Sequence, residues 1–147
     1  MPHFTLPLGP QGPVLKAVVS ISNERSAALT AARQSAPKPV PIMALVDTGA
    51  SSTCVDPSVL TALSLTPTGI VLLNTPSTGG TPHQAEQFDV ALVIPAPVGP
   101  ALIFRTIPVV ASELLASQGF HALIGRDILD QCLFSYNGSI KLFTLAF

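Results

Sequence analysis

One acidic residue stands at the end of an apolar segment in the middle of the chain. Asp47 follows the run IMALV and precedes Thr48 and Gly49. An ionised carboxylate at the end of a buried strand costs free energy unless it gains a charge partner, hydrogen-bond donors or a shared proton. The small residues after it permit a tight turn in which backbone N–H groups face the carboxylate. The alternative is an N-cap or Asx-turn aspartate, the commoner role of an isolated Asp-Thr-Gly.

Two segments together resemble the signature of retropepsin-like aspartic peptidases. The first is ALVDTGASST, in which hydrophobic residues precede Asp-Thr-Gly-Ala and small hydroxylated residues follow. The second is ALIGRDIL, similar to the family's hydrophobic-hydrophobic-Gly-Arg-Asp/Asn segment, in which Gly125, Arg126 and Asp127 are the structural motif residues. A glycine-containing hairpin is expected between them, where the family has its flap. The ordered set is more specific than a lone Asp-Thr-Gly.

The resemblance implies an all-β, retropepsin-like closed β-barrel with one or two short helices, functional as a symmetric homodimer. Only one Asp-Thr-Gly occurs in the 147 residues, so a second copy would supply the second carboxylate. Two adjacent carboxylates share one proton. The ionised one would deprotonate a water that attacks the peptide carbonyl, while the protonated one would donate to the carbonyl oxygen. We therefore expect an aspartic endopeptidase that needs no cofactor and cleaves peptides or unfolded proteins.

The resemblance also implies site residues by position. Asp47 is the expected catalytic acid and base, Thr48 is expected to hydrogen-bond across the two-fold axis, and Gly49 to offer its carbonyl to substrate. The expected substrate-binding residues are Leu45, Gly49, Ala50, Ser51, Thr78, Gly79, Gly80 and Leu123. Ala50 has no hydroxyl with which to favour the ionised carboxylate, so we expect a mildly rather than strongly acidic pH optimum.

One position departs from many retroviral members. Ser51 stands where they have an acid that pairs with the arginine of the C-terminal motif. Arg126 therefore needs another partner, for which the candidates are Asp127, Asp130, Asp56 or a carbonyl at a helix end.

Two other functions stay open beside the peptidase. Ser51 in place of the acid, and a flap segment TPSTGGTP without a large apolar tip residue, are also consistent with a catalytically weak or inactive dimerisation or peptide-binding module. The third possibility is a processing protease limited to its own precursor.

The elements that must position these residues are mainly short strands. Runs rich in Val, Ile, Leu and Thr, separated by 15 prolines and 10 glycines, predict one β domain over residues 1–147. We expect a surface excursion at about 23–40 with one or two helical turns. A short helix should follow Asp56 as its N-cap and Pro57 at its first position.

Three hairpins are predicted. Residues 4–22 contain two strand-like runs around GPQGP, which predict an N-terminal hairpin. The flap hairpin is expected at about 70–94. Asn137 and Gly138, the strongest turn signal in the chain, predict a C-terminal hairpin.

The composition argues against several partners. A net charge of −1 without a local Lys/Arg cluster speaks against nucleic acid. The longest uncharged stretch, 90–104, is interrupted by prolines and is too short to span a membrane, and the N-terminus lacks the pattern of a signal peptide. We expect a cytoplasmic protein without nucleic-acid or membrane partners. Because only 10% of residues are charged and 48% are hydrophobic, self-association is favoured.

Other reactive residues have simpler explanations. Cys54 and Cys132 could pair, but both lie in apolar settings and are expected to be free thiols. No pair of His or Cys has the spacing of metal ligands, so no metal site is expected. Ser51 and Ser52 lack a neighbouring base that could activate a serine nucleophile.

Overall fold

Six strands form the body of the protein. The computed structural model describes residues 1–74, 79–113 and 116–147, so Thr78 lies outside the described residues. The strands follow the order β2 (Val14–Ile21), β3 (Val40–Val46), β8 (Ala122–Ile124), β4 (Cys54–Val55), β7 (Leu102–Ala111) and β6 (His83–Ile94). Pairing of β2 with β6 closes the ring. The predicted all-β closed barrel is confirmed.

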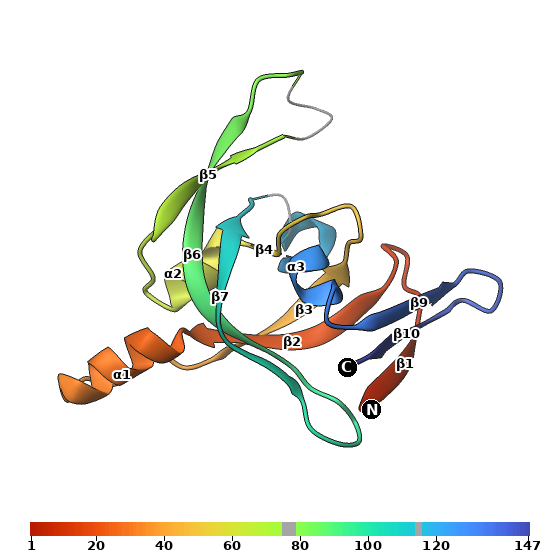
Figure 1. Cartoon of the computed structure of the whole chain (residues 1–147), viewed down its shortest axis with the longest axis horizontal. Coiled ribbons are helices and arrows are strands. Elements are labelled where there is room, and N and C mark those ends of the chain that lie inside the picture. The colour runs from red at the N-terminus through yellow and green to blue at the C-terminus, as the bar shows by residue number, and fades with distance from the viewer. Residues whose placement is uncertain (75–78, 114–115) are drawn as a thin grey trace.

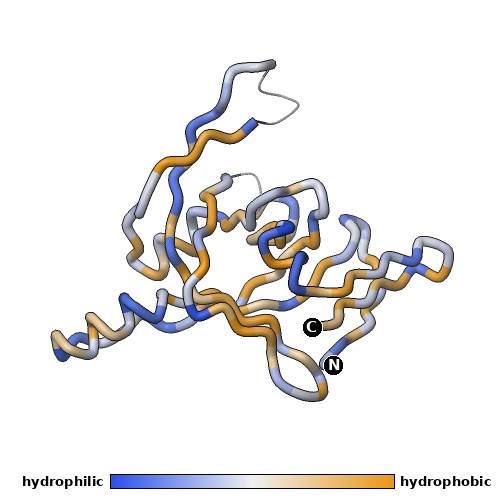
Figure 2. Tube along the Cα trace, in the orientation of Figure 1, coloured by the Kyte–Doolittle hydropathy of each residue, from blue (hydrophilic) through white to orange (hydrophobic). Residues whose placement is uncertain are grey.

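The barrel closes around alternating side chains. Every second residue of β2 and of the C-terminal half of β6 is buried, because successive strand residues face opposite sides of the sheet. Val19, Leu92 and Ile124 from three of these strands are completely buried. Hydrophobic residues recur along the barrel strands in Figure 2, whereas α1 (Asn23–Ala31) is more mixed. This core fixes the rim from which the Asp47 loop departs.

A long ribbon projects beyond the barrel. β5 (Gly69–Leu73) pairs antiparallel with the first residues of β6, from Gly69 opposite Gln87 to Leu73 opposite His83. The ribbon extends away from the barrel in Figure 1. It lies where the flap hairpin was predicted, and Gly79 and Gly80 both have positive φ values that glycine adopts without strain.

The chain termini form a second, three-stranded sheet. β10 (Leu142–Ala146) lies between β1 (His3–Pro7) and β9 (Leu133–Asn137), and both pairings are antiparallel. The predicted C-terminal hairpin is confirmed. Figure 1 shows this sheet beside the barrel, with the two ends of the chain close together.

The predicted N-terminal hairpin is wrong. β1 pairs with β10, whereas β2 pairs with β3 through residues 14–19 and with β6 through residues 18–21. Within the intervening turn only Gly9 and Gly12 form a bridge, and the prolines around them cannot donate ladder hydrogen bonds. Phe4 instead packs edge-to-face on Phe143 and Phe147.

The described part of the chain has three α-helices, one more than the upper expectation. α1 occupies the predicted surface excursion, buries none of its residues and extends away from the barrel in Figure 1. α2 (Pro57–Ala62) begins as predicted, because Asp56 accepts a hydrogen bond from the Ser58 amide at 2.9 Å. α3 (Arg126–Leu129) follows β8 directly, and a 3-10 helix, η2, covers Ala116–Gln118.

Candidate active site

The Asp47 loop begins at the barrel rim, where β3 and β8 run parallel. Val46 lies opposite Ile124 in this pairing, and the Asp47 amide donates to the Ile124 carbonyl at 3.0 Å. On the other side of β3, the Val46 amide donates to the Pro13 carbonyl at 2.9 Å. The start of the loop is therefore held from both neighbouring segments.

Asp47 sits in a tight turn that turns its carboxylate outward. The Gly49 amide donates to Asp47 Oδ1 at 2.8 Å, and the Ala50 amide donates to the Asp47 carbonyl at 3.2 Å. This is the geometry of an Asx-turn, which was the alternative role for this residue. The same turn leaves Asp47 half-buried at the wall of a groove. The two interpretations of Asp47 are thus compatible.

The groove has a volume of about 1140 Å³ and is bounded by the loop, α2, the flap ribbon and the end of β7. Of the predicted substrate-binding residues, Gly49, Ala50, Ser51 and Leu123 line it. Leu45 is not among the described residues that line the groove. It pairs with Leu123 in the sheet and lies near the Gly12 turn. Neither Gly79 nor Gly80 is among the described lining residues of this one chain.

Several groove residues were not singled out from the sequence. Leu60 and Leu65, from α2 and the segment after it, and Phe88 from β6 give the groove apolar walls. Glu86 and Glu113 are exposed and also line it. The hydrophobic spacing of α2 could have indicated an apolar wall, but only the fold places it beside Asp47.

A hydrogen-bonded crossing lies behind the loop. Thr53 is completely buried, its hydroxyl donates to Asp127 Oδ1 at 2.8 Å, and its amide donates to Asp127 Oδ2 at 2.9 Å. The same hydroxyl accepts from the Gly125 amide at 3.1 Å. A Cβ atom on Gly125 would lie 2.6 Å from the Ser52 carbonyl carbon, so only glycine fits this crossing. The motif residues Gly125 and Asp127 thereby fix the far side of the loop.

Arg126 finds its partners in the loop itself. Its Nη1 donates to the Thr48 carbonyl at 2.9 Å and to the Gly49 carbonyl at 3.3 Å. A carbonyl partner was one of the predicted possibilities, but these carbonyls belong to the Asp47 loop rather than to a helix end. Asp127 is turned toward Thr53 and Asp56 toward Ser58.

Two ionisable groups near the groove have shifted pKa values. Burial, with a smaller effect of the Asp127 and Asp47 charges, raises the pKa of the Cys54 thiol to about 11. Burial also acts to raise the pKa of Asp56, but hydrogen bonds from Ser58 and from the Ala116 amide outweigh it and lower the pKa overall. Cys54 is therefore a neutral thiol beside Asp47. Cys54 and Cys132 are both free and half-buried.

Among residues 1–74, 79–113 and 116–147, no group of three or more His, Cys, Asp or Glu side chains could hold a metal ion. In the same described part of the chain, no helix is long and apolar enough to cross a membrane.

The comparison with solved structures shows the fold. The chain matches the crystal structure of a retropepsin-like aspartic protease from Rickettsia conorii with a TM-score of 0.59 and 18% sequence identity. The match covers 97% of this chain and 89% of the other. The fold is retropepsin-like. No protein-family model and no curated protein matches the sequence.

Proposed function

We propose that the protein is an aspartic endopeptidase whose site forms between the Asp47 loops of two identical chains. The observation that carries this proposal is the Asp47 carboxylate, held by the Gly49 amide at the wall of a groove large enough for a peptide. The crossing behind it, made by Thr53, Gly125 and Asp127, gives the rigidity that catalysis by positioned groups requires.

In the proposed mechanism the two Asp47 side chains hold one proton between them, because two adjacent carboxylates do not both ionise readily. The ionised carboxylate takes a proton from a water, which attacks the peptide carbonyl. The protonated carboxylate donates to the carbonyl oxygen as it becomes negative. The pH dependence then belongs to the pair of residues and not to one of them.

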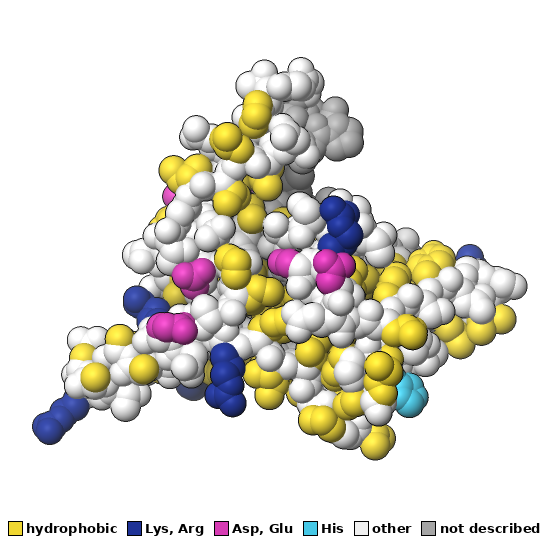
Figure 3. Space-filling model, in the orientation of Figure 1, with side chains coloured by type: hydrophobic (Ala, Val, Ile, Leu, Met, Phe, Trp, Pro, Cys, Tyr) yellow, Lys and Arg dark blue, Asp and Glu magenta, His cyan; other side chains and the backbone are white. Residues whose placement is uncertain are grey.

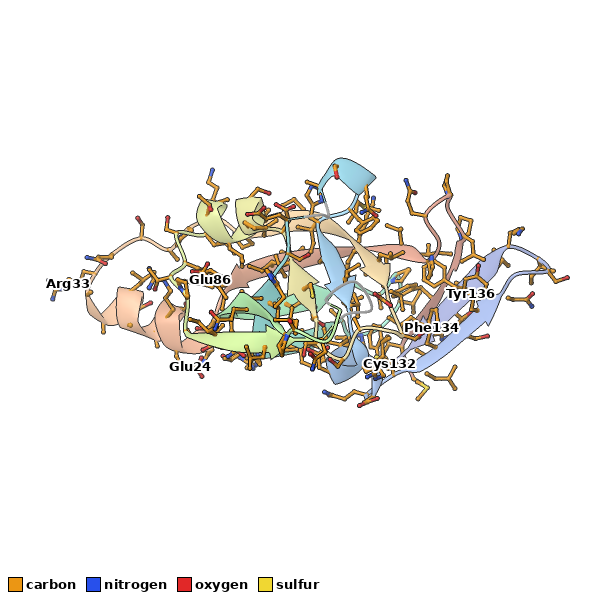
Figure 4. The ribbon with its side chains drawn as sticks, turned by 90° about the horizontal axis from the view of Figure 1, so that it is seen from above. Glu24, Arg33, Glu86, Cys132, Phe134 and Tyr136 are labelled. Atoms are coloured by element: carbon orange, nitrogen blue, oxygen red, sulfur yellow. The ribbon has the colours of Figure 1, made fainter. Side chains whose placement is uncertain are left out.

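Surface features support a homodimer. The terminal sheet has β9 at one edge, and Leu133 and Tyr136 on this strand are 56% and 57% exposed. In Figure 4, Phe134 and Tyr136 lie on β9, at the opposite end of the molecule from Arg33 beyond α1. Figure 3 shows hydrophobic side chains over the terminal sheet and also over the flap, where Ile70 and Leu72 are exposed. An exposed strand edge of this composition favours pairing with another strand.

The proposed substrates are extended peptides or unfolded proteins. A substrate strand would run between the groove and the flap, using main-chain hydrogen bonds for affinity and side-chain pockets for specificity. Leu60, Phe88 and Leu123 make the groove walls apolar, so apolar substrate side chains are the proposed preference.

Incubation with an unfolded protein between pH 4 and 7 tests the proposal. The wild-type protein should cleave it, Asp47→Asn should not, and the matched control Asp89→Asn, which changes an acid of β6 away from the groove, should cleave as the wild type does. Equal cleavage by wild type and Asp47→Asn would refute the proposal. Cleavage of a single junction in the protein's own precursor would favour a processing enzyme, and peptide binding without turnover would favour an inactive module.

A further inference from the structure

Arg126 hydrogen-bonds three consecutive carbonyls of the loop that carries Asp47. Its side chain reaches the Thr48 carbonyl at 2.9 Å and the Gly49 carbonyl at 3.3 Å, and its backbone amide donates to the Ala50 carbonyl at 2.9 Å. One residue therefore sets the direction of three successive peptide groups. Since Ser51 replaces the acid with which a motif arginine could pair, the guanidinium is available for these carbonyls.

The peptide group between Thr48 and Gly49 connects Arg126 with the carboxylate. A trans peptide is planar, and its C=O and N–H point in opposite directions; no described peptide bond is cis. The C=O of this group faces the guanidinium, and its N–H donates to Asp47 Oδ1 at 2.8 Å. An amide whose carbonyl accepts a charge-assisted hydrogen bond is polarised and donates more strongly in turn.

We infer that Arg126 is a positioning residue that acts on Asp47 through the Thr48–Gly49 peptide. It aims the Gly49 N–H at the carboxylate and strengthens this hydrogen bond, which favours the ionised form. This stronger hydrogen bond replaces part of the stabilisation that a hydroxyl at position 50 would give the ionised carboxylate, since Ala50 has no hydroxyl. The effect on catalysis rests on the proposed peptidase function, whereas the effect on the carboxylate does not.

The other ionisable groups around Asp47 are the second Asp47 of the proposed dimer and side chains from each neighbouring element, and an Arg126 variant replaces none of them. Cys54 on β4 is a neutral thiol, and Asp127 on α3 is engaged by Thr53. The charged or titratable residues of the groove walls are His83 and Glu86 on β6 and Glu113 after β7. The described part of β8 contributes only Ala122, Leu123 and Ile124. A change that appears on replacing Arg126 alone is therefore attributable to its guanidinium.

The test is an NMR titration of the Gly49 amide proton, whose chemical shift follows the ionisation of the carboxylate that it binds. In Arg126→Met we expect the first titration midpoint to rise by roughly 0.2–0.6 pH units, from a loss of about 10–30% of a charge-assisted hydrogen bond. Arg126→Lys keeps the charge but has no planar fork for two carbonyls, so it should show a smaller rise. Arg105→Met, which removes an exposed arginine of β7, is the matched control and should leave the midpoint unchanged.

Two results would overturn the inference. An unchanged midpoint in Arg126→Met would show that the peptide does not transmit the interaction, and an unchanged midpoint in Arg126→Lys would show that only the charge matters. The second result remains decisive if Arg126→Met does not fold. In a cleavage assay the pH profile of kcat should shift in the same direction, which a purely structural loss of active protein would not produce. A wild-type protein that cleaves no peptide would refute the proposed function and leave the titration to decide the inference.

Discussion

Adding one methyl group at Gly125 tests the packing behind the Asp47 loop. In Gly125→Ala the new Cβ would lie 2.6 Å from the Ser52 carbonyl carbon, 2.7 Å from the Ser52 oxygen and 2.9 Å from the Thr53 nitrogen. The φ of −87° at Gly125 is open to every residue, so the cost comes from these contacts and not from backbone strain. All three are backbone atoms, which cannot turn aside as a flexible side chain could.

The size of the effect follows from what must move. Carbon atoms in contact prefer separations of about 3.5–4.0 Å, so the backbone of Ser52 and Thr53, just before β4, would have to shift by roughly 1 Å. That shift would stretch the hydrogen bonds that join Thr53 to Asp127 and to the Gly125 amide. Overpacking costs about 1–3 kcal/mol, and the partial weakening of these hydrogen bonds, each worth about 1 kcal/mol when intact, adds about 2 kcal/mol together. We expect a loss of about 3–5 kcal/mol in the free energy of unfolding, or about 10 °C in Tm.

Thermal and urea unfolding followed by far-UV circular dichroism would measure this loss, at one fixed protein concentration because dimerisation changes apparent stability. Gly69→Ala is the matched control, since its Cβ would meet nothing closer than Gln87 Nε2 at 3.9 Å. It should change stability by less than about 1 kcal/mol. If Gly125→Ala were as stable as Gly69→Ala, the tight crossing behind the loop would be refuted.

Three further predictions concern Thr53, Asp56 and the dimer. Thr53→Val should lower the free energy of unfolding by about 2–4 kcal/mol in a urea titration, because it leaves the buried Gly125 amide without its acceptor. The control Thr5→Val changes an exposed hydroxyl pair and should cost under about 1 kcal/mol. Equal losses in the two variants would contradict the hydrogen bonds of Thr53 behind the loop. Because the pKa of Asp56 is lowered in the fold, its ionised carboxylate stabilises the protein fully above the ordinary pKa of 3.8, and this stabilisation is lost as the pH falls through the lowered pKa. The free energy of unfolding should therefore fall less steeply with decreasing pH in Asp56→Asn than in the wild type. An identical slope would contradict this. Cleavage per chain should fall on dilution in parallel with the dimer fraction measured by sedimentation, whereas activity independent of concentration would oppose a shared site.

Local signals in the sequence predicted much of the fold. The turn after Asp47, the cap at Asp56 and the hairpin at Asn137 each depend on a few neighbouring residues, and each forms as expected. The flap ribbon could be placed because two apolar runs flank a glycine-containing segment. These elements are encoded within short windows of the chain.

Long-range choices could not be predicted in the same way. β1 pairs with β10, for example Thr5 with Thr144, and nothing in GPQGP signals that its two flanking strands belong to different sheets. The partners of Arg126 depend on the crossing of β8 behind the loop, which brings a residue near the C-terminus to the carbonyls of Thr48 and Gly49. Thr53 appeared in the sequence only as one small hydroxylated residue, and its role appears once Asp127 lies beside it.

Subunit mixing tests the proposal that one active site needs Asp47 from two chains. Wild-type protein at fixed concentration is equilibrated with increasing amounts of Asp47→Asn, and peptide cleavage is measured after the subunits have exchanged. If two Asp47 residues share one site, mixed dimers are inactive, and activity should fall in proportion to the wild-type fraction of chains. Activity that stays constant as the variant is added would refute a shared site, because each wild-type chain would then carry a complete site.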